Sequence, residues 1–355
     1  MVYILAAILI FGVLIAVHEL GHFLAAKACG VLVHEFAIGM GPAIWKKTKG
    51  ETTYALRLLP VGGFCAMEGE EEDSDNPRAL NNQGFFQKLL IYAAGATMNF
   101  IAGFLIVVVL FAGAQAFYTA EVTAIADGSS LAQPGGMQVG DLILSIDGEK
   151  VYNQGNVTLL LSLNTDGTYD FVVRRNGEKV RIQDFPMERK EFPDGNGGTY
   201  TGFGFTMGGI EKANVFTRLR YSWNSTMDFV RTVRLSLEMI FRGDAGLKDL
   251  SGPVGIVSMI SEVGSESPTT QVAIYNIVYF AAMIAVNLAV MNLLPIPALD
   301  GGRIFFLVIN AVLYALFRKK IDPKYESYVH IIGLALLLSL SVTVTVSDVG
   351  KLFGR

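Results

Sequence analysis

The apolar residues of this chain are gathered into four long runs. They span residues 2–17, 98–114, 274–294 and 331–346, and the first of them contains no charged residue. Each run, with its flanking residues, is about long enough to cross a hydrocarbon core of roughly 30 Å as an α-helix. The pattern therefore predicts an α-helical polytopic membrane protein with about four transmembrane helices.

Between the first two runs the pattern changes to that of extended chain. Residues 36–41 and 53–59 have the apolar content and the glycine and proline punctuation of strands, and a turn rich in Lys and Gly at 46–50 joins them. At membrane depth, strand backbone is tolerated only where protein or a water-filled cavity covers it. We therefore expect a membrane-re-entrant β-hairpin.

Residues 119–187 have the composition of a soluble domain. They include an Asn176-Gly177 turn typical of a β-hairpin. The run from Gly136 to Gly148 resembles the GLxxGDxIxxIDG stretch of bacterial PDZ domains. The segment predicts an inserted α+β PDZ-like domain. Residues 215–241 then place apolar side chains at helical spacing, which predicts an amphipathic helix lying either in the membrane interface or against that domain.

These features divide the chain into four parts. Residues 1–118 hold the first two transmembrane helices and the re-entrant hairpin. Residues 119–187 form the PDZ-like domain, and residues 188–250 form a linker and the amphipathic helix. Residues 251–355 hold the last two transmembrane helices.

The composition supports a membrane protein, and the basic residues orient it. Only 17% of the residues are charged and 52% are hydrophobic, whereas soluble proteins are about a quarter charged. Lys and Arg residues occur in both of the shorter loops, between the first two runs and between the last two. The long segment between the second and third runs also carries many basic residues, but long translocated domains are largely exempt from the positive-inside rule. The positive-inside rule then places both loops in the cytoplasm and the PDZ-like domain outside. The net charge of −4 says little about partners. The absence of a basic stripe and a pI of about 5.7 argue against a nucleic-acid partner.

The first apolar run is a candidate for a signal peptide as well as for a retained helix. No basic residue precedes the run, and no small-residue cleavage site follows it. We therefore expect it to remain as a transmembrane helix. The run leads directly into a motif that has its own chemistry.

That motif is His18-Glu19-Leu20-Gly21-His22. Residues four apart lie on one face of a helix, so the two imidazoles can bind one tetrahedral zinc ion. Glu19 can then take a proton from a water molecule at the metal. HExxH also occurs by chance in soluble helices, but ionisable groups at the end of an apolar run are costly to bury and are functional by default.

A catalytic zinc ion needs a third protein ligand. The metzincin spacing would place it six residues after His22, but Ala28 stands there. His34 and Glu35 follow soon after, but in a different local structure from the helix that carries the motif.

Asp300 is the better candidate for the third ligand. Two prolines before it, Pro295 and Pro297, stop the third helix, and two glycines after it allow close backbone approach. The alternative is that Asp300 caps a helix beginning near Arg303, and on these residues alone this alternative is favoured.

At this point a family resemblance can be stated. The HExxH motif in the first span, the PDZ-like domain after the second, and the sequence NLLPIPALDGG at residues 292–302 resemble the site-2 protease family of intramembrane zinc metalloproteases. The likeness covers essentially the whole chain. It implies Zn²⁺ as cofactor, with His18, His22 and Asp300 as its ligands and Glu19 as the general base.

The same resemblance implies a set of substrate-binding residues. They comprise the GxG loop of the hairpin and four positions around the third span: Gly39, Met40, Gly41, Asn287, Asn292, Pro295 and Pro297. Two features depart from the family pattern. Ala96 replaces the proline that often follows the glycine opening the second span, and the chain has one PDZ-like domain where some relatives have two.

The resemblance implies a zinc metalloendopeptidase of the bacterial cell membrane. Its partners would be the lipid bilayer and single-span membrane proteins, such as anti-sigma factors or remnant signal peptides, cleaved in regulated intramembrane proteolysis. The oligomeric state is left open. Two other classes of protein fit the sequence less well. A membrane PDZ adaptor has no use for Glu19, and a zinc transporter would carry ionisable residues along several spans.

Overall fold

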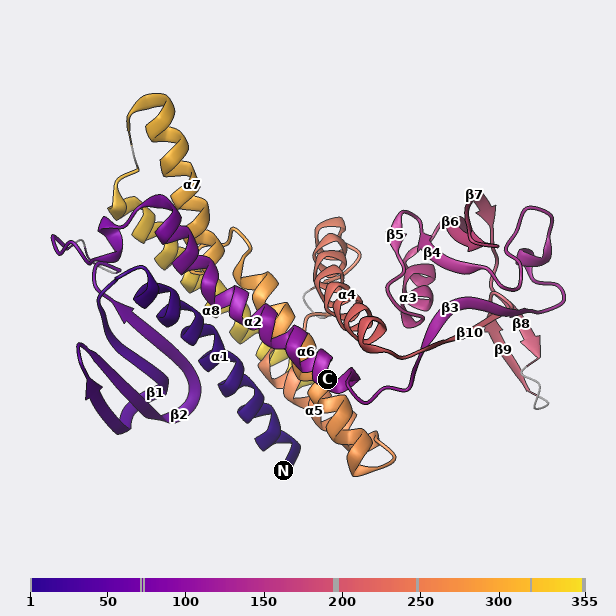
Figure 1. Ribbon diagram of the computed structural model, residues 1–355, viewed down its shortest axis with the longest axis horizontal. Coiled ribbons are helices and arrows are strands. Elements are labelled where there is room, and N and C mark those ends of the chain that lie inside the picture. Colours follow the sequence, from indigo (N-terminus) through magenta and orange to yellow (C-terminus); the bar gives the residue numbers. More distant parts are fainter. Residues whose placement is uncertain are drawn as a thin grey trace. The chain divides into compact units, whose positions relative to one another are not determined.

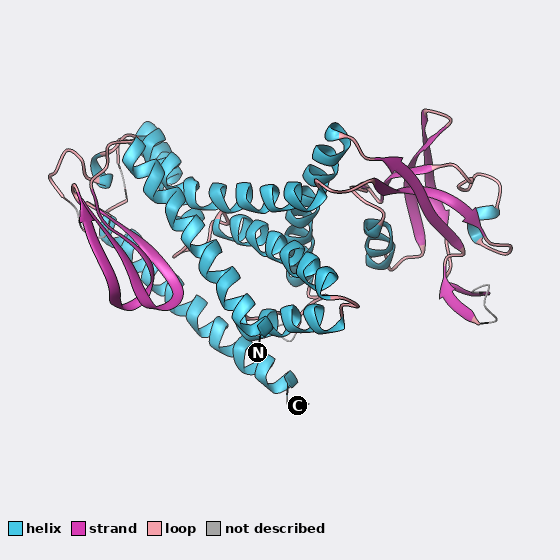
Figure 2. Ribbon diagram, turned by 60° about the horizontal axis from the view of Figure 1, so that its bottom comes forward, coloured by secondary structure: helices cyan, strands magenta, loops and turns pink. Residues whose placement is uncertain are grey.

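The computed structural model describes residues 2–70, 72, 74–193, 198–246, 249–319 and 321–352. The chain folds into two compact units, Met1–Val107 with Phe229–Arg355 and Val108–Asp228. The boundaries between these units fall inside two helices, α2 (Phe85–Phe111) and α4 (Val215–Arg242). Figure 1 labels the elements, and Figure 2 separates helices from strands by colour.

Five of the described helices are long and apolar enough to cross a membrane. They are α1 (Val2–Ala28), α2, α6 (Thr270–Asn292), α7 (Asp300–Phe317) and α8 (Pro323–Leu352). Large apolar side chains such as Leu5, Val109 and Leu336 are more than 60% exposed along these helices. Exposed apolar surface of this extent indicates contact with a membrane.

The sequence predicted about four transmembrane helices, one fewer than these five candidates. The additional candidate is α7. Asp300, Arg303 and Asn310 interrupt its apolar sequence. No uninterrupted run there reaches the length that a membrane crossing needs. The helix follows α6 after only seven residues, 293–299, which include both prolines of the motif.

In the first unit, α1 packs on two different partners. Its middle, with Ala7 and Leu14, joins a buried apolar cluster with Ile260 of α5 (Pro253–Glu266) and Ile284 of α6. Its end, with Ala26, packs with Cys65 in a second buried cluster that covers the adjoining β-sheet. The last turns of α1 are therefore held between the helices and the sheet (Figure 1).

The sheet of the first unit is a long antiparallel hairpin that folds back on itself. Strand β1 (Val33–Lys49) pairs with β2 (Thr52–Met67), and Ala37 of β1 lies opposite both Ala55 and Phe64 of β2. The second half of β1 pairs only with the first half of β2. Two strands thus give four segments side by side, and residues 63–67 form one edge, which we call the edge segment.

The predicted hairpin is therefore present, but its doubling was not foreseen. After β2 the chain passes through a short 3-10 helix, Leu80–Asn82, before α2 begins. Glu51 in the turn of the hairpin accepts hydrogen bonds from Arg78 and from Lys27 at the end of α1. These cations lower the pKa of Glu51 to about 2, so the ion pairs persist at any neutral or mildly acidic pH.

The second unit is an α+β fold. Its sheet has the order β10-β3-β4-β6-β7, with β5 on β4, and a short hairpin of β8 and β9 stands apart. The core includes Val122, Ile146, Phe171 and Val173, all at most 1% exposed. Its elements are β3 (Ala116–Ile125), the 3-10 helix Ser130–Ala132, β4 (Leu142–Ile146), β5 (Glu149–Lys150), α3 (Gly155–Leu163), β6 (Thr168–Arg175), β7 (Glu178–Pro186), β8 (Lys190–Pro193), β9 (Thr199–Gly202) and β10 (Phe205–Lys212).

The run that resembles a PDZ motif is held by one buried ion pair. Asp141 is 1% exposed and accepts two hydrogen bonds from the Arg175 guanidinium, at 2.8 and 2.6 Å. The same carboxylate accepts the Gln138 backbone N–H at 2.8 Å. These hydrogen bonds raise the pKa of Arg175.

Because Asp141 holds both partners, Asp141→Ala should destabilise this unit by about 2–3 kcal/mol, the usual cost of losing hydrogen bonds between charged groups. In the intact protein, amides of β4 and β6 should exchange hydrogen about a hundredfold faster. Asp127→Asn, at an exposed position of the same unit, is the control and should leave exchange unchanged. Equal protection in both variants would show that the ion pair contributes little.

Candidate metal centre

Two imidazoles face one another near the end of α1. The helix continues without interruption to Ala28, so His18 and His22 lie one turn apart on one face. Their Nε2 atoms are 3.2 Å apart. Gly21 lies between them in sequence and brings α1 against α2, because a Cβ at this position would lie 2.8 Å from the Ala94 carbonyl carbon.

Asp300 reaches the same point from the other end of the sequence. Helix α7 begins at Asp300 itself, and its N-cap position is Leu299, whose apolar side chain cannot cap. The alternative prediction of Asp300 as a cap is therefore not what the structure shows. Gly301 and Gly302 allow the turn to fold tightly, since a Cβ on either would collide with the backbone of residues 293–297.

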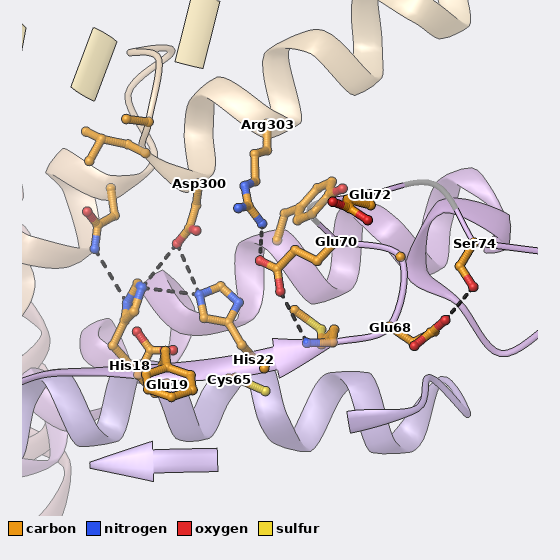
Figure 3. Close-up of a pocket in the computed structure, with 18 residues that line it drawn as sticks. His18, Glu19, His22, Cys65, Glu68, Glu70, Glu72, Ser74, Asp300 and Arg303 are labelled. Atoms are coloured by element: carbon orange, nitrogen blue, oxygen red, sulfur yellow. Dashed lines mark hydrogen bonds and ion pairs between the residues drawn. The ribbon is translucent and has the colours of Figure 1, made fainter. Parts of the chain in front are cut away.

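The three side chains form a triangle of the size that a metal ion requires. The Asp300 Oδ2 atom is 3.3 Å from the Nε2 atoms of both His18 and His22 (Figure 3). Four ligands placed tetrahedrally at 2.0–2.1 Å from zinc are about 3.3–3.4 Å from one another. Among the described residues, His18, His22 and Asp300 form the one group of three His, Cys, Asp or Glu side chains whose ligand atoms lie close enough to hold a metal ion.

A glycine on α2 makes room for this triangle. A Cβ at Gly95 would lie 2.7 Å from Cε1 and 2.8 Å from Nε2 of His18, and would also collide with Nε2 of His22. Real side chains almost never approach so closely. The backbone of α2 therefore forms one wall of the site. Only glycine fits there while both imidazoles keep these positions.

Hydrogen bonds orient both imidazoles. His22 Nδ1 is 2.8 Å from the Ile91 carbonyl oxygen, which can only accept, so Nδ1 carries the proton and Nε2 has a free lone pair. His18 Nδ1 faces the side-chain amide of Asn292 at 3.5 Å. As placed, the amide NH₂ of Asn292 donates to His18 Nδ1, which leaves the ring proton on Nε2. With the amide turned by 180°, its oxygen accepts from Nδ1–H instead, and His18 Nε2 has a free lone pair. The Ile91 carbonyl prepares His22 Nε2 to bind a metal, and Asn292 in the turned orientation does the same for His18.

The triangle opens into a cavity of ≈ 790 Å³. Glu19, at the cavity wall, lies beside His18 in Figure 3. The edge segment also lines the cavity, through Phe64 to Met67. Glu19 fits beneath this segment because position 63 is glycine, where a Cβ would lie 3.1 Å from Cγ of Glu19.

The cavity also holds a second set of polar groups, which the sequence did not predict. Arg303, one turn after Asp300 on α7, forms an ion pair with Glu70 at 2.5 Å, and its guanidinium lies 5.8 Å from the Tyr92 ring centroid. Beside them, hydrogen bonds from Ser74 and His34 lower the pKa of Glu68. Arg303 and Glu70 are 233 residues apart, so no local pattern could have revealed their contact.

The predicted substrate-binding residues do not all lie in one place. Of the described residues in that set, Asn292 alone lines the cavity. Gly39 and Gly41 flank Met40 with φ of 89° and 84°, where β1 bends between its two halves. Asn287 lies on α6 with its Oδ1 atom buried, and Pro295 and Pro297 lie between α6 and α7.

Comparison with known proteins relates the whole chain to metallopeptidases. The sequence model of peptidase family M50 matches residues 6–340. A Clostridium perfringens protein that is named as a zinc metalloprotease is 36% identical, and the alignment covers 98% of each chain. The regulator of sigma-W protease RasP of Bacillus subtilis is 30% identical over 99% of each chain, and the zinc metalloprotease RasP of Shouchella clausii is 28% identical over the same share.

If Gly95 makes room for the ligands, then Gly95→Ala should lower zinc affinity at least tenfold. Alanine stabilises a helix by about 1 kcal/mol relative to glycine. Helix propensity alone therefore predicts that Gly95→Ala makes the fold more stable, not less. Chelator competition on the purified full-length protein measures the zinc affinity. Gly113→Ala, at a position where a Cβ meets nothing within 4 Å, is the matched control. Unchanged zinc affinity in Gly95→Ala would contradict the geometry.

Proposed function

Since the chain belongs to peptidase family M50 and is a zinc metallopeptidase, we propose that it hydrolyses peptide bonds within transmembrane segments of single-span membrane proteins. Its five apolar helices and its family make it a multi-pass bacterial membrane protein. The observation that carries the proposal is the position of the ligand triangle. It is assembled from side chains within the apolar helix α1 and at the start of the apolar helix α7, so a substrate must reach it within the helical bundle.

We assign the metal ligands as His18, His22 and Asp300. The assignment rests on the donor set, two imidazoles and one carboxylate, and on the three distances among the donor atoms. Asp300 Oδ2 is also buried and accepts no hydrogen bond from the described residues, so a cation would give this oxygen the partner it lacks. Bound zinc supplies the positive charge that polarises a peptide carbonyl and acidifies a water molecule.

Glu19 is the general base in this proposal. It follows His18 in sequence and lines the same cavity, so its carboxylate is within the reach of water beside the ligand triangle. The carboxylate takes a proton from the attacking water and returns a proton to the leaving amine. The edge segment passes close to Glu19 at Gly63, where a Cβ would lie 3.1 Å from Cγ of Glu19.

The substrate must unwind before it can be cut. In a transmembrane helix each carbonyl accepts a hydrogen bond from the next turn, and the lipid offers no alternative partner. The edge segment can supply these partners, because its inner side pairs with β1 and its outer side borders the cavity. A substrate strand added along it keeps its backbone hydrogen bonds and passes the ligand triangle in extended form.

Polar groups around the cavity would position that strand. Asn292 can bind a substrate carbonyl or hold His18, and it is the best-placed of the substrate residues implied by the family resemblance. We propose that Gly39, Met40 and Gly41 act through the bend of the hairpin and that Pro295 and Pro297 act through the turn before Asp300. Asn287 would act from α6, one helical turn and one residue before Asn292.

The substrate class is proposed from the fold and from a relative. The name of the Bacillus subtilis relative refers to sigma-W, which supports membrane regulators of a sigma factor as substrates. Remnant signal peptides have the same single-span character. The α+β unit, which we propose to be an extracytoplasmic PDZ-like domain, would exclude substrates that still carry a bulky outer domain.

Replacing the base tests the mechanism. Glu19→Gln should reduce cleavage of a model single-span substrate by about 10²- to 10⁴-fold, the usual contribution of general acid–base catalysis. Zinc content should remain at the wild-type level, because Glu19 is not a ligand. Glu266→Gln, at an exposed position on α5, should cleave normally. Undiminished cleavage by Glu19→Gln with zinc bound would rule out this mechanism.

A cysteine on the open face of the edge segment tests strand addition. Cys65 is buried against α1, whereas the next residue, Ala66, is partly exposed and lines the cavity. In the Glu19→Gln protein carrying Ala66→Cys, substrates with single cysteines should form disulfides at positions two residues apart, the period of a strand. The Glu19→Gln protein with only its native Cys29 and Cys65 is the control and should not form these crosslinks. Crosslinks spaced by three or four residues would instead indicate a bound helix.

A further inference from the structure

The turn before Asp300 has an unusual backbone. The Leu299 N–H donates to the Ile296 carbonyl at 3.2 Å, and Ala298 has a φ of 74°. Pro297 occupies the second position of this turn, where its ring holds φ near −65°. A turn with proline second and a positive φ third is type II, and its third position favours glycine. Here that position holds alanine, so the conformation needs support from outside the turn.

The direction of the Asp300 side chain depends on this turn. Only Leu299 separates Ala298 from Asp300, and Gly301 and Gly302 pack directly against the backbone of residues 293–297. The segment therefore has little freedom to compensate for a change at Ala298. A flip of this turn would rotate the Asp300 carboxylate away from His18 and His22.

Helix α8 supplies the support through His330. The Ala298 backbone N–H donates to His330 Nδ1 at 2.8 Å. The hydrogen bond that closes a type II turn does not use this N–H, which would otherwise lie unpaired among apolar groups at a cost. The imidazole packs on the Phe306 ring of α7, with centroids 5.5 Å apart. Its second nitrogen, Nε2, is buried without a hydrogen-bond partner in the described part of the chain.

The next turn of α8 completes the seat for the proline. A Cβ at Gly333 would lie 3.0 Å from the Pro297 carbonyl oxygen and would collide with the proline ring. His330 and Gly333 thus contact adjacent residues of one turn from one face of α8. A histidine within an apolar helix is costly and is functional by default.

We propose that His330 is a positioning residue of the metal centre. By accepting the Ala298 N–H, it holds the type II turn and thereby aims Asp300 at the two imidazoles. The inference rests on the proposed role of Asp300 as a zinc ligand. Groups that orient metal ligands typically contribute ten- to a hundredfold to metal affinity or activity.

Two substitutions separate the acceptor from the bulk of the ring. His330→Phe keeps a ring against Phe306 but removes the acceptor, whereas His330→Asn places an amide oxygen where Nδ1 was. In the intact protein, we expect His330→Phe to lower zinc affinity by chelator competition, and kcat, by about tenfold or more. KM should stay within about twofold, and His330→Asn should stay within about threefold of wild type in all three quantities.

A third variant tests the role of the backbone. Glycine adopts a positive φ without support, so Ala298→Gly in the His330→Phe protein should recover part of the lost zinc affinity. If His330→Phe does not fold, His330→Asn is compared with His330→Gln, whose amide oxygen falls at the Nε2 position instead. His330→Gln should then lower zinc affinity and kcat by about as much as is expected for His330→Phe.

The results that overturn the inference are specific. Wild-type zinc affinity and kcat in His330→Phe would do so, as would equal impairment of His330→Asn and His330→Phe, or equal behaviour of the Asn and Gln variants. Asp300→Asn tests the proposed function separately from the role of His330. If that variant keeps full zinc affinity, the ligand assignment is wrong, whatever His330 does.

Discussion

The structure depends on one electrostatic constraint. Two imidazoles and a carboxylate meet with donor atoms 3.2–3.3 Å apart at the ends of apolar helices. Ionisable groups in such surroundings are expensive to bury, and a carboxylate oxygen left without a partner adds to the cost. A divalent cation at the centre of the triangle offsets both costs, because it accepts the lone pairs of the two neutral imidazoles and gives the carboxylate a partner of opposite charge.

The rest of the first unit keeps that triangle at its required size. Gly21 and Gly95 bring α1 and α2 close enough for the imidazoles to occupy the space between them. The interruption between α6 and α7 turns the chain so that Asp300 opens a new helix at the site. The doubled hairpin then covers the remaining side and offers an extended edge beside Glu19. The helices hold the metal-binding side chains in place, and the hairpin borders the cavity that leads to them.

Much of this could be read from the sequence, because the features concerned are local. The apolar runs predicted α1, α2, α6 and α8, and the HExxH spacing placed two imidazoles on one helical face. The prolines and glycines around Asp300 indicated a broken helix. The strand pattern indicated the hairpin between the first two spans.

What the sequence did not reveal depends on tertiary contacts. The doubling of the hairpin depends on pairing across its bends, which alternation of side chains does not encode. The pair of Glu70 and Arg303 joins segments from opposite ends of the chain. Helix α7 was missed because polar residues interrupt its apolar run; two of them, Asp300 and Arg303, line the cavity. His330 was detectable as a lone histidine in an apolar helix, but its partner, a backbone N–H, has no signature in sequence.

The most direct test of the ligand assignment is zinc K-edge X-ray absorption on the intact protein. We expect a shell of nitrogen and oxygen at about 2.0–2.1 Å with the outer-shell signals of two imidazoles. Asp300→Asn should weaken zinc binding while the two-imidazole signal persists in the metal that remains. A sulfur shell at about 2.3 Å, or one imidazole instead of two, would contradict the assignment of His18, His22 and Asp300.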